Sequence, residues 1–424
     1  QLFGRVKEVP LHIVDGGDSS IDGGDYILFF AQRNDGWLDS TLYLDSSTVG
    51  SPGISLYNDT IQYFLTWNGS TSNLRYTVET DVDFASYTPA SHFMYTVRRS
   101  FTDEYYEGQK SSDITSSFFV PGEGWGGPKY DGVPGGWSST PSLSTPLSYT
   151  GAGAPNADFL ALCVSASNAI TWGSPYNHHL RLRLGNSGSI IQDTSFYGYA
   201  QIKTVASIAA SELGASGTPF YFEIIDDLNV ATDNQALTFL QLKYARQTHF
   251  AGLPELQFNV QNSQTEAKTR LDIISAGYSD PIVFVHGETP RLIPFLPNGG
   301  MHSMLIPNSV SGIEQSVVYS NYSEVNTVSL APVNGNGVFT DFSTIPGIQD
   351  SALLMVFHES LENGVNNYKS YRESIQGGGY NVVKANVEEL YQQFGGGVEK
   401  HIAGIRRFAH YIDANSTQKP SGLF

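Results

Sequence analysis

Cysteine is almost absent from the sequence, and this absence excludes a fold held together by disulfide bonds. Cys163 is the one thiol among 424 residues, so the chain cannot form an internal disulfide and must be stabilised by its size and packing. A chain of this length is long enough for roughly three domains, each with its own core. The sequence also lacks the G-x-S-x-G, H-E-x-x-H, P-loop and dinucleotide-binding motifs. No reaction can therefore be inferred from a local motif.

Basic residues and long apolar runs are also scarce. Lys and Arg number 23 against 41 Asp and Glu, which gives a formal net charge of −18. Nucleic acids and anionic membrane surfaces require a basic protein face, so neither is expected as a partner. No apolar run approaches the ~20 residues that cross a bilayer, so the chain is not expected to span a membrane. The chain begins at Gln1 rather than Met, and we expect a processed or trimmed polypeptide.

Aromatic residues and glycine, in contrast, are abundant. Phe, Trp and Tyr make up 12% of the chain, which also contains 43 glycines. Aromatic side chains favour pleated, half-buried strand surfaces, whereas Gly and Asn favour turns. The composition therefore predicts a β-rich, extracytoplasmic protein.

Alternation of apolar and polar residues predicts three β-rich units along most of the chain. We expect an N-terminal β domain over 1–147, a jelly-roll-like β-sandwich over 148–250 and another β-rich domain over 251–345. The clearest expected strands lie at 26–30, 61–67, 92–99 and 178–184. A run rich in Gly and Pro over 121–137 predicts an irregular loop instead.

The apolar pattern changes near residue 346. Residues 352–357 form a continuous apolar run, typical of a strand covered on both faces. Helical spacing of apolar residues over 361–375, a strand pattern over 380–386 and further helical spacing over 388–412 follow. This order is the start of a doubly wound parallel sheet. We therefore expect 346–424 to be the incomplete start of a parallel α/β domain that continues beyond the residues given.

Four carboxylates lie close together in the N-terminal stretch VDGGDSSIDGGDY. Asp15, Asp18, Asp22 and Asp25 could supply several of the six to eight oxygen ligands that Ca²⁺ takes. Their spacing is not that of an EF-hand, and Asp and Gly are also ordinary turn formers. Two interpretations stay open, a Ca²⁺ site and a solvated turn. No other metal or cofactor is expected.

The thiol and imidazole groups suggest no second site. Cys163 lies in the apolar stretch LALCV, where no cation would stabilise a thiolate, and we expect it in a core. His178 and His179 are neighbours on an expected strand, so they point to opposite faces and cannot share one metal ion. His286 and His358 each end an apolar strand without a Cys or Ser partner, and we interpret both as structural. No catalytic residue is predicted.

Three tryptophans raise the separate question of glycan binding. Trp125, Trp137 and Trp172 each offer a flat ring on which a sugar could stack. Nothing in their spacing singles out a sugar site, and packing is the simpler interpretation.

Several stretches together resemble a known family. KEVPLHIVDGGDSSIDGGDYILFFAQRNDGWLDSTLYLD, SLYNDTIQYFLTW and GEGWGG are similar to the N-terminal β-region of gingipain-family cysteine peptidases of Bacteroidota, in particular the PorU-like members of the type IX secretion system. DSALLMVFHESLENGVNNYKSYRESIQGGGYNVVKANVEELYQQFGGG, followed by KHIAGIRRFAHYI, is similar to the start of that family's caspase-like peptidase domain. The order of these pieces is more specific than any one of them.

The resemblance implies a function for the complete protein. The family uses a Cys–His dyad at the carboxyl ends of parallel strands, and no residue of this chain matches it, so 1–424 alone is predicted to be inactive. Complete PorU-like members remove the C-terminal sorting signal of secreted cargo and attach the cargo to surface lipopolysaccharide. The expected location is the extracellular face of the outer membrane, or outside the cell. The expected partners are outer-membrane or surface components of the type IX secretion system and secreted cargo proteins. The alternative is a non-catalytic module whose β domains dock on a surface partner or bind glycan.

Overall fold

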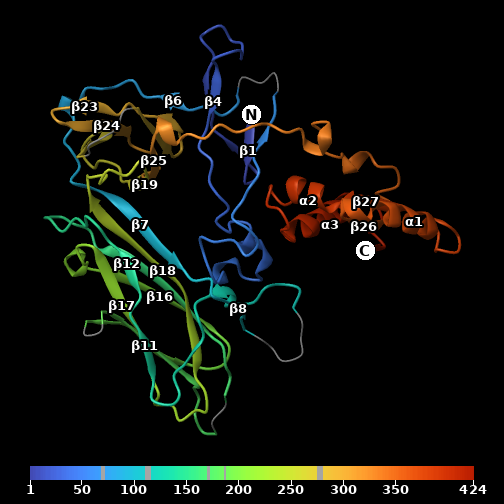
Figure 1. The fold of residues 1–424 in the computed structure, drawn as a ribbon, viewed down its shortest axis with the longest axis horizontal. Helices are drawn as coiled ribbons and strands as arrows, with labels where there is room; N and C mark the ends of the chain where they lie inside the picture. Colours follow the sequence, from blue (N-terminus) through green and yellow to red (C-terminus); the bar gives the residue numbers. More distant parts are fainter. Residues whose placement is uncertain (68–71, 110–115, 170–171, 186–187, 275–279) are drawn as a thin grey trace.

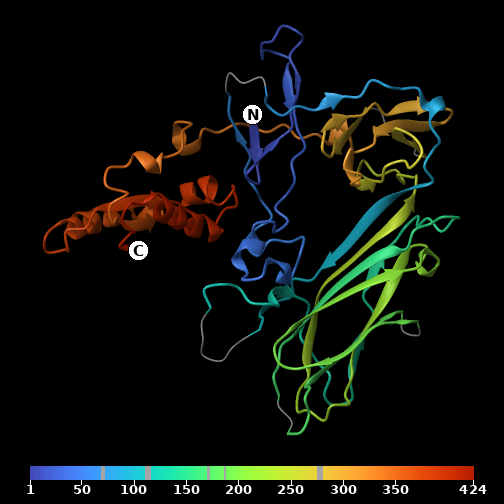
Figure 2. The same ribbon diagram turned by 180° about the vertical axis from the view of Figure 1, so that it is seen from behind.

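The computed structural model describes residues 1–67, 72–109, 116–169, 172–185, 188–274 and 280–424. These residues form two β-sandwiches, an N-terminal segment and an α/β unit (Figure 1). The N-terminal segment lies between the sandwiches and the α/β unit, as the view from behind also shows (Figure 2). The expected fold class, mainly β with an α/β unit at the C-terminal end, is confirmed.

One large sheet runs through both sandwiches. Among the described residues it contains ten strands, which are antiparallel except where β22 pairs with β6. In spatial order the strands are β16 (Gln201–Ile208), β13 (Ala157–Ser165), β18 (Asn234–Gln247), β7 (His92–Ser100), β19 (Glu255–Val260), β25 (Gln315–Asn321), β21 (Pro281–His286), β22 (Arg291–Leu292) and β6 (Thr77–Val78), with β10 (Tyr130–Asp131) paired to β18. Because β7 pairs with β18 on one side and β19 on the other, both sandwiches share this sheet.

Two smaller sheets cover one face of the large sheet, one in each sandwich. The first contains β11 (Trp137–Ser139), β12 (Ser142–Ser144), β17 (Gly217–Ile224), β14 (His178–Leu184) and β15 (Ile190–Phe196). The second contains β20 (Lys268–Ile273), β24 (Met301–Pro307) and β23 (Leu296–Asn298). The alternation expected in β14 is confirmed, since Leu180 and Leu182 are buried in the first sandwich while Arg181 and Arg183 form ion pairs with Asp193 and Glu223.

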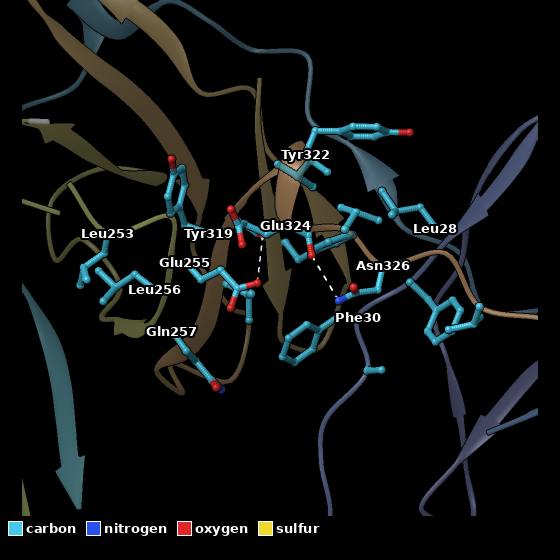
Figure 3. Close-up of a pocket in the computed structure, with 18 of the residues that line it drawn as sticks. Leu28, Phe30, Leu253, Glu255, Leu256, Gln257, Tyr319, Tyr322, Glu324 and Asn326 are labelled. Carbon is cyan, nitrogen blue, oxygen red and sulfur yellow. Dashed lines mark hydrogen bonds between the residues drawn. The ribbon is translucent and has the colours of Figure 1, made fainter. Parts of the chain in front are cut away.

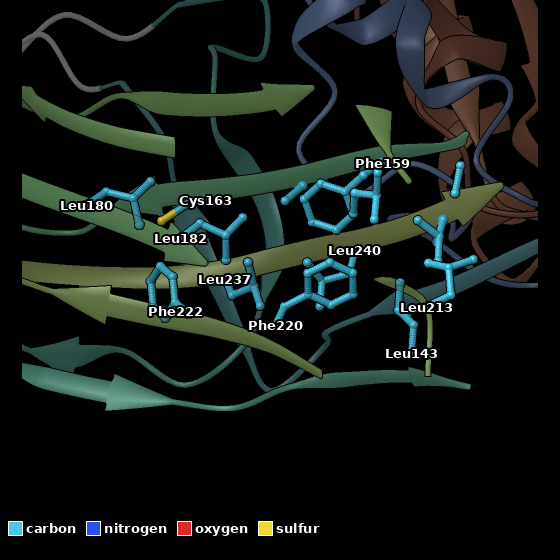
Figure 4. Close-up of a cluster of buried hydrophobic side chains, with 14 of the residues drawn as sticks. Leu143, Phe159, Cys163, Leu180, Leu182, Leu213, Phe220, Phe222, Leu237 and Leu240 are labelled. Carbon is cyan, nitrogen blue, oxygen red and sulfur yellow. The ribbon is translucent and has the colours of Figure 1, made fainter. Parts of the chain in front are cut away.

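Each sandwich has its own hydrophobic core. In the first, Phe159 of β13 stacks on Phe220 of β17 with ring centroids 4.4 Å apart, and Cys163 lies in the same cluster (Figure 4). The second core is rich in aromatic rings, among them Phe250 and Phe258. Inward-facing side chains that interdigitate between two sheets explain why the alternating stretches of the sequence form these sandwiches.

Arg246 lies where the two cores meet. Its side chain is only 1% exposed, and its guanidinium carbon is 4.8 Å from the ring centroid of Tyr95. Within the described chain, its Nη2 donates one hydrogen bond to the carbonyl of His249 (3.3 Å), its Nε has no partner and no carboxylate pairs with it. Burying an ion costs several kcal/mol, of which a desolvated cation–π contact recovers about 2 kcal/mol. The Phe93 ring also faces the cation, with its centroid 6.0 Å from the guanidinium carbon, so the buried charge is compensated by aromatic rings rather than by a carboxylate.

Small sheets and 3₁₀-helices build the N-terminal segment. Their bounds are β1 (Leu2–Gly4), β2 (Lys7–Val9), β5 (Phe64–Leu65), β3 (His12–Val14), β4 (Tyr26–Leu28), β8 (Glu104–Glu107), β9 (Glu123–Gly126), η1 (Asp39–Leu42) and η2 (Ser46–Thr48). η3 (Phe84–Ser86) lies against the second sandwich, where Arg270 of β20 donates to the carbonyl of Phe84 (2.6 Å). The strand expected over 61–67 is shorter in the structure, because the N–H of Gln62 bonds instead to the carbonyl of Gly397 in the α/β unit (3.0 Å). The loop expected over 121–137 in fact contains β9 and β10, because β8 and β18 pair with them.

The α/β unit has the predicted order of strands and helices. Its parallel sheet has the order β27 (Val382–Asn386), β26 (Leu353–Phe357) and β28 (Gly422–Leu423), with helices α1 (Glu362–Glu373), α2 (Val387–Gln393) and α3 (Ala403–Asn415). Leu390 of α2 and Phe408 of α3 pack on Leu354 and Val383. α1 lies on the opposite face, where Lys384 bonds to its Asn366 (2.5 Å). No helix in the described ranges has the length and apolarity needed to cross a bilayer.

Two details of the predicted helix at 361–375 are wrong. Leu361 and Ile375 lie outside α1 and are exposed, and α1 has no buried residue. The spacing of these apolar residues matched a helix, but the chain turns at Ser374, whose backbone is extended. The remaining 3₁₀-helices are η4 (Ala210–Glu212), η5 (Tyr322–Glu324), η6 (Val333–Gly335), η7 (Phe342–Thr344) and η8 (Glu359–Leu361).

The four-unit division of the chain stays a prediction. β7 comes from the expected 1–147 unit, β18 from 148–250 and β19 from 251–345, yet all three are neighbours in one sheet. The α/β strands form a sheet of their own.

A buried Asp39–His401 pair joins the α/β unit to the N-terminal segment. The Nε2 of His401 lies 2.9 Å from Oδ1 of Asp39, and both side chains are almost fully buried. The N–H of Ala403 donates to Nδ1 of His401 (3.1 Å), so Nε2 carries the proton and donates to Asp39. The N–H of Leu56 also donates to Asp39 (2.6 Å), and the Tyr57 ring lies 4.3 Å from the His401 ring. Asp39 thus satisfies buried donors from both sides of the junction.

Replacing Asp39 with alanine tests this junction. Asp39→Ala leaves two buried donors without an acceptor, and we expect a loss of about 3 kcal/mol in stability. Differential scanning calorimetry should show the α/β unit unfolding at a lower temperature. The matched control is Asp413→Ala, since Asp413 forms an exposed pair with Lys419 (3.7 Å) that is worth less than about 1 kcal/mol. Equal shifts in both variants would contradict the role assigned to Asp39.

A second substitution tests the cost of the buried guanidinium. Arg246→Met keeps an unbranched side chain of similar length but removes the buried charge, and we expect the sandwiches to gain about 1–2 kcal/mol of stability. Chemical denaturation, followed by fluorescence of the tryptophans, measures the change. Arg181→Met is the control, because Arg181 is partly exposed and paired with Asp193. A marked loss of stability in Arg246→Met would show that the guanidinium contributes more than it costs.

Candidate functional site

Cys163 occupies the core position expected for it. The side chain is buried among Leu180, Leu182 and Phe222 of the first sandwich (Figure 4). Burial raises the pKa of the Cys163 thiol far above its ordinary value, so the reactive thiolate is disfavoured. Cys163 is therefore not a nucleophile in this fold.

His178 and His179 point to opposite faces of β14, as predicted, and do not share a site. His178 is buried, with Nδ1 2.6 Å from Oδ1 of Asp233. His179 lies between Asp193 (2.6 Å) and Asp227 (2.8 Å). Burial lowers the pKa of the His179 imidazole, but the hydrogen bonds with the two carboxylates outweigh this effect and raise it above its ordinary value. Both histidines anchor loops to the sandwich.

His286 is packed on the outer face of the large sheet. Its ring centroid lies 5.0 Å from that of Phe30 and 5.9 Å from that of Tyr76. Burial lowers the pKa of His286 to about 4, so the ring is neutral near pH 7. This environment agrees with the structural interpretation.

His358 lies at the carboxyl end of β26, the edge where parallel sheets place functional groups. Its Nε2 is 3.1 Å from Oε1 of Glu388, at the start of α2, and the N–H of Ser360 donates to its Nδ1 (3.2 Å). The sequence did not reveal this pair. The signal was present, however, because parallel pairing of β26 and β27 brings the residues that follow both strands to one edge.

The four aspartates lie in the exposed turn between β3 and β4. Asp15 accepts a hydrogen bond from the N–H of Gly17 (3.1 Å), Asp18 from that of Ser20 (2.8 Å), and Asp25 from that of Asp22 (2.8 Å). The carboxylates thus stabilise the turn itself. Within the described ranges, no three His, Cys, Asp or Glu side chains are grouped as metal ligands would be. The calcium site stays a prediction.

The three tryptophans do not form a common platform. The rings of Trp125 and Tyr105 meet edge-to-face, with their centroids 5.5 Å apart. Trp137 stacks on Tyr130, with a centroid distance of 3.6 Å, and makes an edge-to-face contact with Phe222. Trp172 is fully exposed. Packing accounts for Trp125 and Trp137.

A groove of about 1120 Å³ lies on the outer face of the large sheet (Figure 3). Its floor is formed by β7, β19, β25 and β21. Its walls include the stretch 26–31, which contains β4, and the stretch 322–328, which follows β25. The groove therefore depends on segments that are far apart in the sequence.

The two sides of the groove differ in polarity. Leu28 and Phe30 pack against Phe284 and Val318 and make one side apolar. On β19 the even-numbered residues Leu256, Phe258 and Val260 are buried in the second core, so Glu255, Gln257 and Asn259 face outward and make the floor polar. Tyr26 and Tyr322 meet edge-on at the rim, with ring centroids 6.3 Å apart.

The charged groups of the groove are mainly acidic. Glu255 and Glu324 lie close to its centre (Figure 3), whereas Arg98 donates from Nε to Gln241 (2.7 Å). None of the described residues that line the groove is Cys, His, Lys or Asp. The described lining thus contains neither a thiol nor an imidazole, the two groups of a Cys–His dyad. Its exposed polar groups and apolar side are suited to binding.

The groove could not be found from the sequence. The alternation ELQFNVQ indicates that β19 has one polar face, which is the available local signal. The two walls come from segments that look like ordinary connections, and their position over the sheet is set by tertiary packing.

A comparison with protein families finds a match for the C-terminal part of the chain. Residues 348–424 match the model of Peptidase family C25. No curated protein sequence matches the chain.

One solved structure resembles the chain over its full length. Dimeric latent PorU from Porphyromonas gingivalis has a TM-score of 0.55 and 10% identity, with 100% of this chain and 38% of that chain covered. Infectious bursal disease virus of the Gx strain and the VP2 subviral particle of that virus have TM-scores of 0.22 and 0.21, at 11% and 10% identity. They cover 62% and 61% of this chain and 46% and 48% of their own, and scores this low carry no argument.

At 10% identity, the similarity to PorU shows that this chain has a similar fold and shows nothing about its activity. The chain spans 38% of the length of that protein. The resemblance to the gingipain family is confirmed, because residues 348–424 match Peptidase family C25 and the chain has a PorU-like fold from end to end.

Proposed function

We propose that this chain is part of a PorU-like surface protein whose complete form processes secreted cargo and attaches it at the cell surface in a type IX secretion system. One observation carries the proposal: the match to Peptidase family C25 follows a β-region that shares the fold of PorU along the whole chain. Because the chain spans 38% of that protein, the activity, cargo and partners all belong to the proposal.

The proposal gives the described residues a supporting role. The carboxyl edge of β26 and β27, where His358 and Glu388 lie, is the edge at which the Cys–His dyad of such a peptidase assembles. The one thiol, Cys163, is buried in the core of the first sandwich rather than at this edge. We propose that residues 1–424 alone are inactive.

The surroundings of the protein follow from the same proposal. A net charge of −18 suits a solvated surface protein and is unfavourable for nucleic acid. We place the protein on the extracellular face of the outer membrane or outside the cell, in contact with surface components of the secretion system and with cargo.

A second candidate function is a non-catalytic docking module. The groove on the large sheet favours it, because its described lining offers polar and apolar groups for binding but neither member of a Cys–His dyad. The two candidates differ in whether the complete protein carries a dyad, which sequencing of the gene downstream of residue 424 decides.

Deletion of the gene in its host tests the proposed function. If the complete protein processes cargo, secreted proteins in the deletion strain keep their C-terminal sorting signals, which mass spectrometry of the cell surface detects. The complete gene should restore processing, whereas a gene that encodes only 1–424 should not. Normal processing in the deletion strain would refute the proposal, and restoration by 1–424 would refute the inactivity of this chain.

Calcium binding at Asp15, Asp18, Asp22 and Asp25 is part of the proposal and has its own test. If these carboxylates hold Ca²⁺, isothermal titration of chelator-treated protein with CaCl₂ shows one binding event, and Asp18→Asn/Asp22→Asn abolishes it. The control Asp59→Asn/Asp413→Asn removes two exposed carboxylates elsewhere and should leave binding intact. The absence of binding heat in the unmodified protein would leave the solvated turn as the explanation.

A further inference from the structure

The segment after β25 has the properties of a strand without a partner. Residues 325–331, VNTVSLA, contain no Pro, Gly or charged residue, and Val325, Thr327 and Val328 are β-branched. The segment is exposed and lies outside every strand and helix. Within the described chain, the backbone groups of residues 326–331 form no hydrogen bonds. Such a segment is a template on which another chain can add as a strand.

This segment forms one wall of the groove. Residues 325–328 line it, as does the stretch 26–31. A chain that paired with the groove side of 325–328 would therefore lie over the floor of the groove, to which β19 contributes polar side chains. Because side chains alternate along a strand, one of its faces would meet the floor and the other would point away from it.

The charges of the groove indicate the chemistry of the added strand. The carboxylate of Glu255 accepts one hydrogen bond, from the Ser320 hydroxyl (3.4 Å), and that of Glu324 accepts one, from the Ser323 hydroxyl (3.5 Å). Neither forms an ion pair in the described chain, whereas the one basic group of the lining, Arg98, bonds to Gln241. Arg98 keeps its positive charge, because Gln241 is neutral, but the two carboxylates outnumber it. The net charge of the groove is therefore negative, and it complements basic side chains.

The aromatic residues of the rim do not favour a sugar. Tyr26 and Tyr322 meet at 69° to one another, so they form an edge-to-face pair and not the open platform on which a sugar ring stacks. The unpaired backbone beside the groove is matched by a polypeptide, which has its own N–H and C=O groups.

We propose that the groove binds an extended polypeptide segment with basic side chains, which adds as a strand along residues 325–328 and places those side chains near Glu255 and Glu324. This binding does not require a peptidase reaction, so it can be tested separately from the proposed function.

A labelled peptide tests the proposal directly. The probe is the end-blocked peptide Val-Lys-Val-Lys-Val-Lys-Val, titrated with the full chain 1–424 and followed by fluorescence anisotropy. The control peptide has Glu in place of each Lys. We expect the Lys peptide to bind at least about tenfold more tightly than the Glu peptide. Equal affinity of the two peptides, or no binding of either, would refute the proposal.

Charge variants separate contact in the groove from attraction by the whole protein. Glu255→Gln/Glu324→Gln should weaken binding of the Lys peptide about tenfold. Glu359→Gln/Glu399→Gln changes the net charge equally but alters exposed residues outside the groove, and should change affinity by less than about twofold at 150 mM salt. Equal effects of the two double variants would show that only the overall charge attracts the peptide, and would refute a site in the groove.

Proline substitutions test the backbone pairing. Neighbouring N–H groups of an extended strand point to opposite sides, so only one of Thr327→Pro and Val328→Pro removes a donor that faces the groove. We expect one of the two to weaken binding and the other to retain it. Equal affinity in both variants would refute strand addition.

Two other occupants are distinguished in the same experiments. Binding of neutral maltohexaose in place of the peptide would assign the groove to a glycan and overturn the proposal. Concentration-dependent dimerisation in analytical ultracentrifugation, lost in Val328→Pro and unaffected by the peptide, would assign the segment to a second copy of the chain and would also overturn it.

Discussion

The antiparallel pairing of β7 with β18 is the contact on which the remaining architecture depends. Residues 92–100 pair with 239–247 in one unbroken register, and β7 also reaches β19. These two pairings turn the sheets of two sandwiches into a single large sheet with one continuous outer face. That face is the floor of the groove, so the groove exists only because the sandwiches are joined edge to edge. Arg246 lies at the same junction. Its guanidinium faces Tyr95, a residue of β7 that packs against both hydrophobic cores.

The α/β unit is attached to this frame through a few buried polar contacts. Asp39 binds His401 on one side of the junction and Leu56 on the other. A second such contact involves the chain that connects β25 to β26. The carboxylate of Glu389 accepts hydrogen bonds from Asn334 (2.7 Å) and from the Thr340 hydroxyl (3.0 Å), which fastens residues 334–340 to α2. Buried acceptors of this kind define position more sharply than apolar contacts, because displacement leaves donors unsatisfied. The chain between β25 and β26 is therefore anchored near its C-terminal end, whereas the backbone of 326–331 has no hydrogen-bond partner among the described residues.

The sequence predicted those features whose cause is local. In β14, Leu180 and Leu182 face the core whereas Arg181 and Arg183 do not, as the alternation indicates. The run Leu353–Phe357 reflects a strand covered on both faces. Prediction failed where a distant partner decides the structure. Gln62 bonds to Gly397, so the strand expected around it is short, and Asp39 meets a histidine 362 positions away. The groove was missed for the same reason, because its walls carry no periodic signal and are placed over the sheet by the fold as a whole.

Residues 325–331 lack the features with which natural proteins protect an exposed strand from pairing with other chains. Edges are normally blunted by Lys, by Pro, by a bulge or by a covering element. Between Val325 and Ala331 there is no such residue, and Pro332 follows only after the groove has ended. Exposed Val328 and Leu330 make the segment costlier to leave bare than a polar linker of the same length. The acidic groups, by contrast, lie directly beside it, at Glu324 and Glu255. The backbone of such a segment can pair with a strand of almost any sequence. The neighbouring carboxylates repel acidic chains and attract basic ones, so they select the partner by its charge.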